Sequence, residues 1–183
     1  MLSIEYSDNI TIERFTIQNG EEGLGGGIKI NGCSPTVQKN VIQNNAGGGI
    51  YVDDSSAIIL DNTIKYNESF SGGGIEVLRN SSSIIKGNII TYNIAETVGG
   101  GISIESCAGN VPVIIGNFIA YNTAKLYGGI YMVPDTYYDI PPVIGGTYFS
   151  DKDNFSTIWS NICDLDQIFP MYYSNNYVYD TCP

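Results

Sequence analysis

The chain has 183 residues, of which 43% are apolar, and it carries 19 acidic and 8 basic side chains for a formal net charge of −11. This length and apolar content suit one packed domain. The negative charge argues against nucleic acid and anionic membranes as partners, because both bind basic surfaces.

The N-terminal residues enter a pattern of short apolar alternation almost at once, at Ile10 to Ile12. They lack the basic and apolar regions of a signal peptide. No apolar run in the chain approaches the roughly 18 residues that cross a bilayer, so we expect no membrane insertion. We expect the chain to be a piece of a longer protein, with its leader and earlier coils missing. The alternative is a complete small protein whose first strand is a cap.

A glycine triplet followed by isoleucine recurs along the chain. It begins at Gly25, Gly47, Gly72 and Gly99, with a degenerate copy at Tyr127, so successive copies are 22, 25, 27 and 28 residues apart. A period in the twenties predicts a stacked solenoid. The glycines fit a tight corner where no side chain has room or where φ is positive. A phosphate-binding loop is disfavoured, because no lysine or helix follows the motif.

Each triplet is followed by a short strand with period-two alternation, in which one set of side chains faces inward and the other faces water. The outward set is Lys29, Tyr51, Glu76, Ser103 and Tyr131. Two further strands per repeat have the inward columns Val37, Ile59, Ile85, Ile114 and Ile42, Ile64, Ile90, Ile119. Parallel crossovers are overwhelmingly right-handed. The predicted fold is therefore all-β, a right-handed parallel β-helix (solenoid) of about five coils over residues 1–146.

Asparagines recur in two columns, one before and one after the third strand of each repeat. The first is Asn40, Asn62, Asn88 and Asn117, and the second is Asn45, Asn67, Asn93 and Asn122. We interpret both as structural: asparagine tolerates the left-handed conformation of a bend, and stacked amides bond along a ladder. Binding of sugar hydroxyls is the functional alternative.

The cysteines fall into two groups. Cys33 and Cys107 share one column three coils apart, about 14 Å at the rise between strands, so both should be free and buried. Residues 147–183 lose the repeat and are predicted to form a C-terminal cap over the open end of the solenoid. A Cys163–Cys182 disulfide would staple this cap. Two unpaired thiols, and an aromatic sugar-binding patch in place of the cap, are the alternatives.

Two copies of the combined asparagine and glycine motifs resemble a known family. Ile119-Ala120-Tyr121-Asn122 leads to Gly128-Gly129-Ile130, and Ile90-Thr91-Tyr92-Asn93 leads to Gly100-Gly101-Ile102. They resemble the repeats of chlamydial polymorphic outer membrane proteins and, more broadly, the right-handed parallel β-helix or pectate-lyase-like superfamily. The resemblance implies the fold but leaves the function open, since adhesins, lyases, hydrolases and tailspikes share it.

Catalytic candidates are few. The chain has no histidine, which removes the commonest general base. The acidic candidates are Asp53, Asp54, Asp61 and Glu76. A pair of them across coils could cleave a glycoside or hold calcium; the alternative is solvated loop acids. Neither Arg14 nor Arg79 is expected to pair with an acidic cluster. No other metal or cofactor is indicated.

Tyrosines stand at equivalent positions of successive coils and could present rings and hydroxyls to sugars or rigidify the stack. They are Tyr51, Tyr66, Tyr92, Tyr121 and Tyr131. Regular repeats, an acidic surface and the lack of histidine favour a non-enzymatic secreted or cell-surface module: a stalk, adhesin or glycan-contact domain. A polysaccharide lyase or glycoside hydrolase is the alternative. Expected partners are polysaccharide or a cell-surface glycan, and self-association through the N-terminal coil. An ice-binding surface is disfavoured, because the outward columns are mixed.

Overall fold

The computed structural model describes residues 1–7, 9–21, 23–105 and 112–132, together with the backbone of residues 143–144, 157–159 and 162–163. Every regular element in these residues is a β-strand. The strands are β1 (Leu2–Glu5), β2 (Thr11–Glu13), β3 (Thr16–Gln18), β4 (Ile28–Asn31), β5 (Thr36–Gln38), β6 (Val41–Gln43), β7 (Ile50–Asp53), β8 (Ile58–Leu60), β9 (Thr63–Lys65), β10 (Glu68–Ser71), β11 (Ile75–Leu78), β12 (Ile84–Lys86), β13 (Ile89–Thr91), β14 (Ile94–Val98), β15 (Ile102–Glu105), β16 (Val113–Ile115), β17 (Phe118–Ala120), β18 (Thr123–Leu126), β19 (Ile130–Met132), β20 (Val143–Ile144), β21 (Thr157–Trp159) and β22 (Ile162–Cys163).

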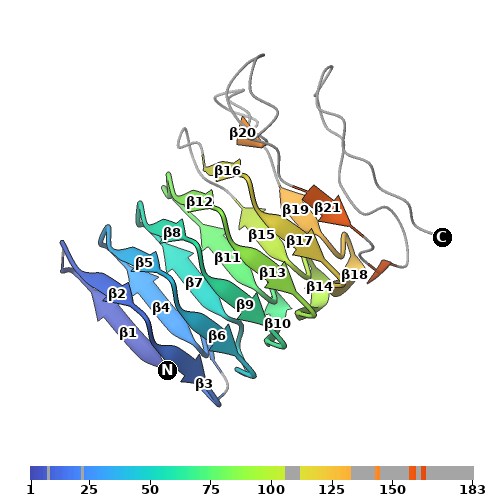
Figure 1. Ribbon diagram of the computed structural model, residues 1–183, viewed down its shortest axis with the longest axis horizontal. Helices are drawn as coiled ribbons and strands as arrows, with labels where there is room; N and C mark the ends of the chain where they lie inside the picture. The colour runs from blue at the N-terminus through green and yellow to red at the C-terminus, as the bar shows by residue number, and fades with distance from the viewer. Residues whose placement is uncertain are drawn as a thin grey trace.

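These strands form four sheets that run along the molecule, and Figure 1 shows successive coils stacked as parallel rungs. We name them sheet A (β1-β4-β7-β11-β15-β19), sheet B (β2-β5-β8-β12-β16-β20), sheet C (β3-β6-β9-β13-β17-β21) and sheet D (β10-β14-β18-β22). The pairings in the described part of the chain are parallel. The prediction of an all-β parallel solenoid of about five coils is confirmed.

The register is the predicted one. In sheet A, Ile28 pairs with Ile50, Ile50 with Ile75 and Ile75 with Ile102. The inward isoleucine and valine columns of sheets A, B and C are almost fully buried and form one continuous core. Each fully buried aliphatic side chain stabilises the fold by roughly 1.5–3 kcal/mol. Cys33 is buried in this core and has no disulfide partner, as predicted.

A fourth sheet is the main feature that the sequence prediction missed. Three strands per coil were expected, but later coils add a fourth strand directly after the second asparagine: β10 after Asn67, β14 after Asn93 and β18 after Asn122. The 22-residue repeat that starts at Gly25 has room only for a single bridge there, between Ala46 and Glu68. Much of the added length of the longer repeats therefore lies after the second asparagine, in sheet D, although the repeats that begin at Gly72 and Gly99 also gain one and three residues before the first asparagine.

The two asparagine columns form continuous hydrogen-bonded ladders. The Oδ1 atom of Asn67 accepts from the backbone N–H and the Nδ2 of Asn45, at 3.1 and 2.8 Å. Its Nδ2 donates to the carbonyl of Ile42 at 3.0 Å and to Oδ1 of Asn93 at 2.9 Å. The other column repeats this pattern, as at Asn62, where the same four bonds measure 2.8–3.1 Å.

The left-handed backbone at these corners lies one residue before each asparagine, which corrects the prediction. Positive φ occurs at Lys39 (55°), Asp61 (53°), Asn44 (52°) and Tyr66 (54°), whereas the buried ladder asparagines do not have it. The asparagines are therefore placed for their amides alone, and the bend is made by the preceding residue.

The last glycine of each triplet stands where neighbouring coils touch. A Cβ atom on Gly74 would lie 2.5 Å from the carbonyl oxygen of Gly101 and 2.8 Å from Cγ2 of Ile90. Equivalent close contacts with the next coil surround Gly27, Gly49 and Gly101. Only glycine permits this spacing, which explains why the triplet recurs.

At the C-terminal end, β19 to β22 add one further rung to the four sheets. Strands β21 and β22 lie inside the segment predicted as a cap. The cap itself, Cys107 and the Cys163–Cys182 disulfide lie outside the residues whose side chains the structure describes.

Candidate functional site

The outward surface of sheet A brings together several of the predicted site residues, among them Tyr51, Glu76 and Tyr131. We call it the sheet A face and define it by two columns: Lys29, Tyr51, Glu76, Ser103 and Tyr131, and beside them Asn31, Asp53, Leu78 and Glu105. Side chains of one column lie directly over one another, about 4.8 Å apart, because the strands pair in register.

This face is partly enclosed, contrary to the expectation that its side chains lie in water. Tyr51 is 4% exposed and Ser103 is fully buried. The covering is at least partly the work of sheet D, since Ser71 at the end of β10 donates its hydroxyl to Ser103 Oγ at 3.1 Å. Between Tyr51 and Ser103, Glu76 remains half-exposed.

Burial and a neighbouring acid perturb the acidity of Glu76. Its pKa is raised to about 7, first by burial and then by the nearby Glu105 carboxylate, while a hydrogen bond from Ser71 opposes the shift. Burial disfavours the charged form of an acid, and a like charge adds to that effect. Ser103 Oγ in turn lies 3.4 Å from Glu105 Oε1, so the Ser103 hydroxyl lies between Ser71 and the Glu105 carboxylate.

Asp53 is held in an ion pair that the sequence prediction did not include. It ends β7, is 4% exposed, and binds the Arg79 guanidinium through both carboxylate oxygens, with Nε to Oδ1 at 2.7 Å. The reading of Asp53 as a solvated loop acid is therefore wrong, and so is the expectation that Arg79 lacks an acidic partner.

The two tyrosines of the sheet A face have depressed acidity. Burial raises the pKa of Tyr51, Glu76 raises it further, and Arg79 opposes this. Burial also raises the pKa of Tyr131, followed by the effects of Glu105 and Tyr127. Both phenols therefore stay protonated at neutral pH, and the Tyr51 hydroxyl lies 3.5 Å from Asp53 Oδ2.

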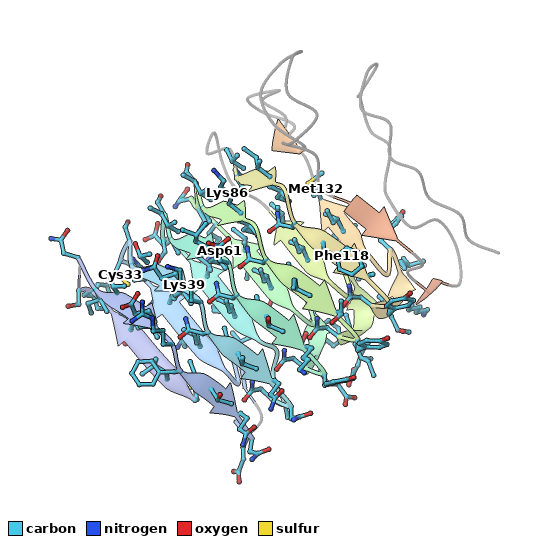
Figure 2. All side chains as sticks on the ribbon, viewed as in Figure 1. Cys33, Lys39, Asp61, Lys86, Phe118 and Met132 are labelled. Atoms are coloured by element: carbon cyan, nitrogen blue, oxygen red, sulfur yellow. The ribbon has the colours of Figure 1, made fainter. Side chains whose placement is uncertain are left out.

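The two other predicted acids lie apart from this cluster. Asp54 follows Asp53 into the corner after β7 with φ at 47°, and its carboxylate accepts from Asn80 at 3.3 Å. Asp61 lies at the corner between sheets B and C, as Figure 2 shows. The structure thus groups Glu76 with Asp53 on one face but excludes Asp61 from it.

The remaining predicted tyrosines form a separate row at the corner between sheets C and D. Tyr66, Tyr92 and Tyr121 stack with ring centroids 5.2 and 5.1 Å apart and interplanar angles of 19° and 12°. They are 51%, 46% and 41% exposed. Because each ring face meets the next ring, the row offers mainly edges and hydroxyls to solvent, and sugar stacking on its inner faces is blocked.

The described part of the chain contains no group of three acidic or cysteine side chains arranged to hold a metal ion. Among these residues, no such group supports the predicted calcium site. Among the same residues, no helix is long and apolar enough to cross a membrane.

Sequence reasoning missed Glu105, Ser71 and the role of Arg79. Glu105 had a usable signal: it follows Ser103 by two residues, as Asp53 follows Tyr51, so the register places both on the sheet A face. Ser71 gave none, because its place over the face depends on the fourth sheet.

Comparisons with known proteins agree with this architecture. A protein-family profile described as "Right handed beta helix region" matches residues 1–118. No curated protein and no solved structure gave a significant match. The profile covers more than half of the chain and matches the coils described above. The chain therefore belongs to the right-handed β-helix family.

Proposed function

We propose that the chain is a non-enzymatic module that contacts glycans through the sheet A face, as part of a secreted or cell-surface stalk or adhesin. The observation that carries this proposal is a row of half-exposed polar side chains on alternate rungs: Lys29, Glu76 and Tyr131 in one column, with Asn31 and Glu105 in the column beside it.

A glycan chain presents hydroxyls at regular intervals, and it needs donors and acceptors held in fixed positions. Strand pairing fixes the rungs of this face, and the fourth sheet restrains it from one side through Ser71. Preorganisation of this kind lowers the entropic cost of binding. The outward surfaces of sheets B and C are less suited, because their later coils carry Ile58, Ile84 and Ile89.

Isothermal titration of the whole chain with oligosaccharides tests this proposal. We expect measurable binding to at least one glycan, and we expect Tyr131→Ala combined with Asn31→Ala to weaken it at least tenfold. Tyr66→Ala is the matched control, because it removes a tyrosine from the other row. Equal weakening by the control, or no glycan binding at all, contradicts the proposal.

A second candidate function is glycoside hydrolysis, and one observation favours it. The pKa of Glu76, about 7, suits a general acid near neutral pH, and Glu105 lies diagonally opposite on the next strand as a second carboxylate. In such a reaction Glu76 protonates the leaving oxygen, while Glu105 activates water or attacks the sugar.

A reducing-end assay separates the two functions. If the module only binds, no sugar ends are released from a bound glycan at any pH between about 5 and 9, a range that spans the Glu76 titration. If it hydrolyses, release follows the protonated fraction of Glu76 and stops in Glu76→Gln.

A further inference from the structure

We infer that Asn9 and Asn80 are sites of N-linked glycosylation, and that Asn67, which has the same acceptor sequence, is excluded from it by the fold. The inference rests on the secreted location in the proposed function, because this modification belongs to secreted proteins. It assigns covalently attached sugars to the chain itself, at a place apart from the centre of the sheet A face.

The acceptor sequence for this modification is an asparagine followed two residues later by serine or threonine, with any residue except proline between them. The described residues contain three copies: Asn9-Ile10-Thr11, Asn67-Glu68-Ser69 and Asn80-Ser81-Ser82. A fourth copy, Asn154-Phe155-Ser156, lies outside the described residues. The sequence alone does not distinguish the three described copies, whereas their positions in the fold do.

Asn67 has no room for a sugar in the folded chain. Its side chain is fully buried, and its Nδ2 donates to the carbonyl of Ile42 at 3.0 Å and to Oδ1 of Asn93 at 2.9 Å. A sugar on Nδ2 replaces one of the two amide hydrogens that these bonds use, and the packed coils leave no space for it. A molecule modified at Asn67 would therefore lose this rung of the ladder.

Asn9 and Asn80 lie instead at the corner between sheets A and B, and both side chains are exposed. Figure 1 shows the connections from sheet A to sheet B aligned along one edge of the stack. These connections are one residue longer in the two coils with an acceptor asparagine than in the two coils between them: 6–10 and 79–83 against 32–35 and 54–57. Both asparagines have positive φ, 63° and 44°, which asparagine tolerates. The longer corners therefore present their asparagines to solvent.

The amide nitrogen at such a corner is open to a transferring enzyme. The hydrogen bond described for Asn80 Nδ2 is long, at 3.3 Å, and joins it to the exposed carboxylate of Asp54. Transfer forms a bond between Nδ2 and C1 of the first sugar, and breaks the bond from C1 to the diphosphate of a polyprenyl-linked oligosaccharide. The amide proton leaves with the polyprenyl diphosphate. The amide keeps its second hydrogen, so a bond to Asp54 remains available.

Glycans at the two corners would project from the same side of the solenoid, about 14 Å apart at the rise of three coils. The glycan on Asn80 would stand beside Ile84, an outward residue of sheet B that is 39% exposed. Attached sugars are bulky and solubilising, and exposed apolar surface of this kind favours association. The modification would therefore protect the apolar part of sheet B.

Production of the full chain behind a secretion leader in cultured animal cells tests the inference. Peptide mapping by mass spectrometry measures the occupancy of each acceptor separately, so the copy at Asn154 does not interfere. We expect most secreted molecules to carry a glycan at Asn9 and at Asn80, and none to carry one at Asn67. A glycan at Asn67 in secreted, folded protein, or an unoccupied Asn9 or Asn80, overturns the inference.

Substitution of the hydroxyl residue locates the effect without altering the asparagine or its backbone conformation. Thr11→Ala and Ser82→Ala should each remove the glycan from their own corner, whereas Ser82→Thr should keep it. Ser69→Ala is the matched control, because it removes the acceptor sequence of Asn67 but leaves the ladder amide in place. It should leave the pattern of the secreted protein unchanged. Far-UV circular dichroism checks that each variant folds, and a glycan that persists in Thr11→Ala or Ser82→Ala contradicts the assignment.

Failure of this inference can be told apart from failure of the proposed function. A secreted chain that lacks both corner glycans but still binds oligosaccharides refutes this inference alone. A chain that the cells do not secrete refutes both, because both need passage through a secretory compartment.

Discussion

At the scale of single residues, the buried polar side chains fix the register between neighbouring coils. The eight ladder asparagines are 0–2% exposed, yet their amides find partners in the coils above and below. A buried amide is stabilising only when both its donor and its acceptor are satisfied. The ladders therefore specify the register, because a shift of one residue would leave every amide in the column unpaired.

Removing one rung of a ladder should be costly. Asn67→Ala deletes four hydrogen bonds and leaves the backbone N–H of Asn45 and the carbonyl of Ile42 without these partners. We expect a loss of about 4 kcal/mol or more in the free energy of unfolding. Gln43→Ala, which removes one exposed amide bond to Gln18, should cost about 1 kcal/mol or less in the same urea titration. Similar losses for both variants would contradict this role of the ladder.

Ser83 gives the opposite prediction. Its hydroxyl is buried without a hydrogen-bond partner, and Ala57 holds the same place on the preceding rung, since Ile84 donates to its carbonyl. Ser83→Ala should be neutral or stabilise the fold by about 1 kcal/mol. Ser81→Ala should instead destabilise it, because Ser81 Oγ accepts the N–H of Ser55 at 3.2 Å. Thermal unfolding of the two variants checks the contrast, which fails if Ser83→Ala is the more damaging change.

Glu76 predicts a dependence of stability on pH. Its folded pKa is raised from 4.5 to about 7, so the folded state holds the proton more tightly than the unfolded chain. Its contribution is therefore favourable at low pH and is lost as pH rises from about 4.5 through 7. Glu76→Gln should raise the free energy of unfolding by up to about 3 kcal/mol at pH 8 and change it little at pH 4. Denaturant titrations at both pH values measure this, and an equal effect at both would contradict a titration of Glu76 as its origin.

At the scale of elements, neighbouring coils approach each other so closely at the glycine corners that a side chain there has no room. Gly74→Ala should destabilise the fold by about 3 kcal/mol or more, because the added Cβ meets backbone of the next coil. Gly48→Ala distinguishes the effect of steric contact from the effect of backbone conformation. A Cβ atom on Gly48 would meet nothing closer than 3.4 Å, but the φ of Gly48 is 91°. We expect a smaller loss of about 1–2 kcal/mol there. Equal losses in urea unfolding would show that backbone conformation, not contact, sets the glycine requirement.

The strands of sheets A, B and C could be predicted from the sequence. In each of them inward apolar and outward side chains alternate, and this pattern recurs with the same spacing as the glycine triplets. Sheet D could not, since β10 (Glu68–Ser71) and β14 (Ile94–Val98) share little beyond their position after an asparagine. The environment of the candidate site could be predicted only in part for the same reason, because sheet D covers part of it. Glu76 was identified by its outward register, but its raised pKa depends partly on burial that the register alone did not reveal.

The ion pair between Asp53 and Arg79 shows a second limit of sequence reasoning. The two residues are 26 positions apart, and the length of the repeat does place the corner after β11 over the corner after β7. The direction in which a long arginine side chain folds back over its own sheet does not follow from the period, so the pairing required coordinates.

At the scale of the whole molecule, the sheets differ in what they present to solvent. The sheet A face is polar and acidic, whereas sheets B and C become apolar in the later coils, where Ile84, Ile89 and Phe118 are 39%, 47% and 41% exposed. Stability in such a stack is a sum over coils and their contacts with neighbours, so every surface depends on the same parallel register.

Engineered disulfides test that register most directly. Ile58 and Ile84 are outward partners on adjacent rungs of sheet B, about 4.8 Å apart, which is within the range that a disulfide spans. Ile58→Cys combined with Ile84→Cys should cross-link on mild oxidation, as shown by peptide mapping. Ile58→Cys combined with Lys86→Cys, two residues out of register and roughly 8 Å apart, should not. Cross-linking of the second pair in place of the first would contradict the stacked fold and every assignment made from it.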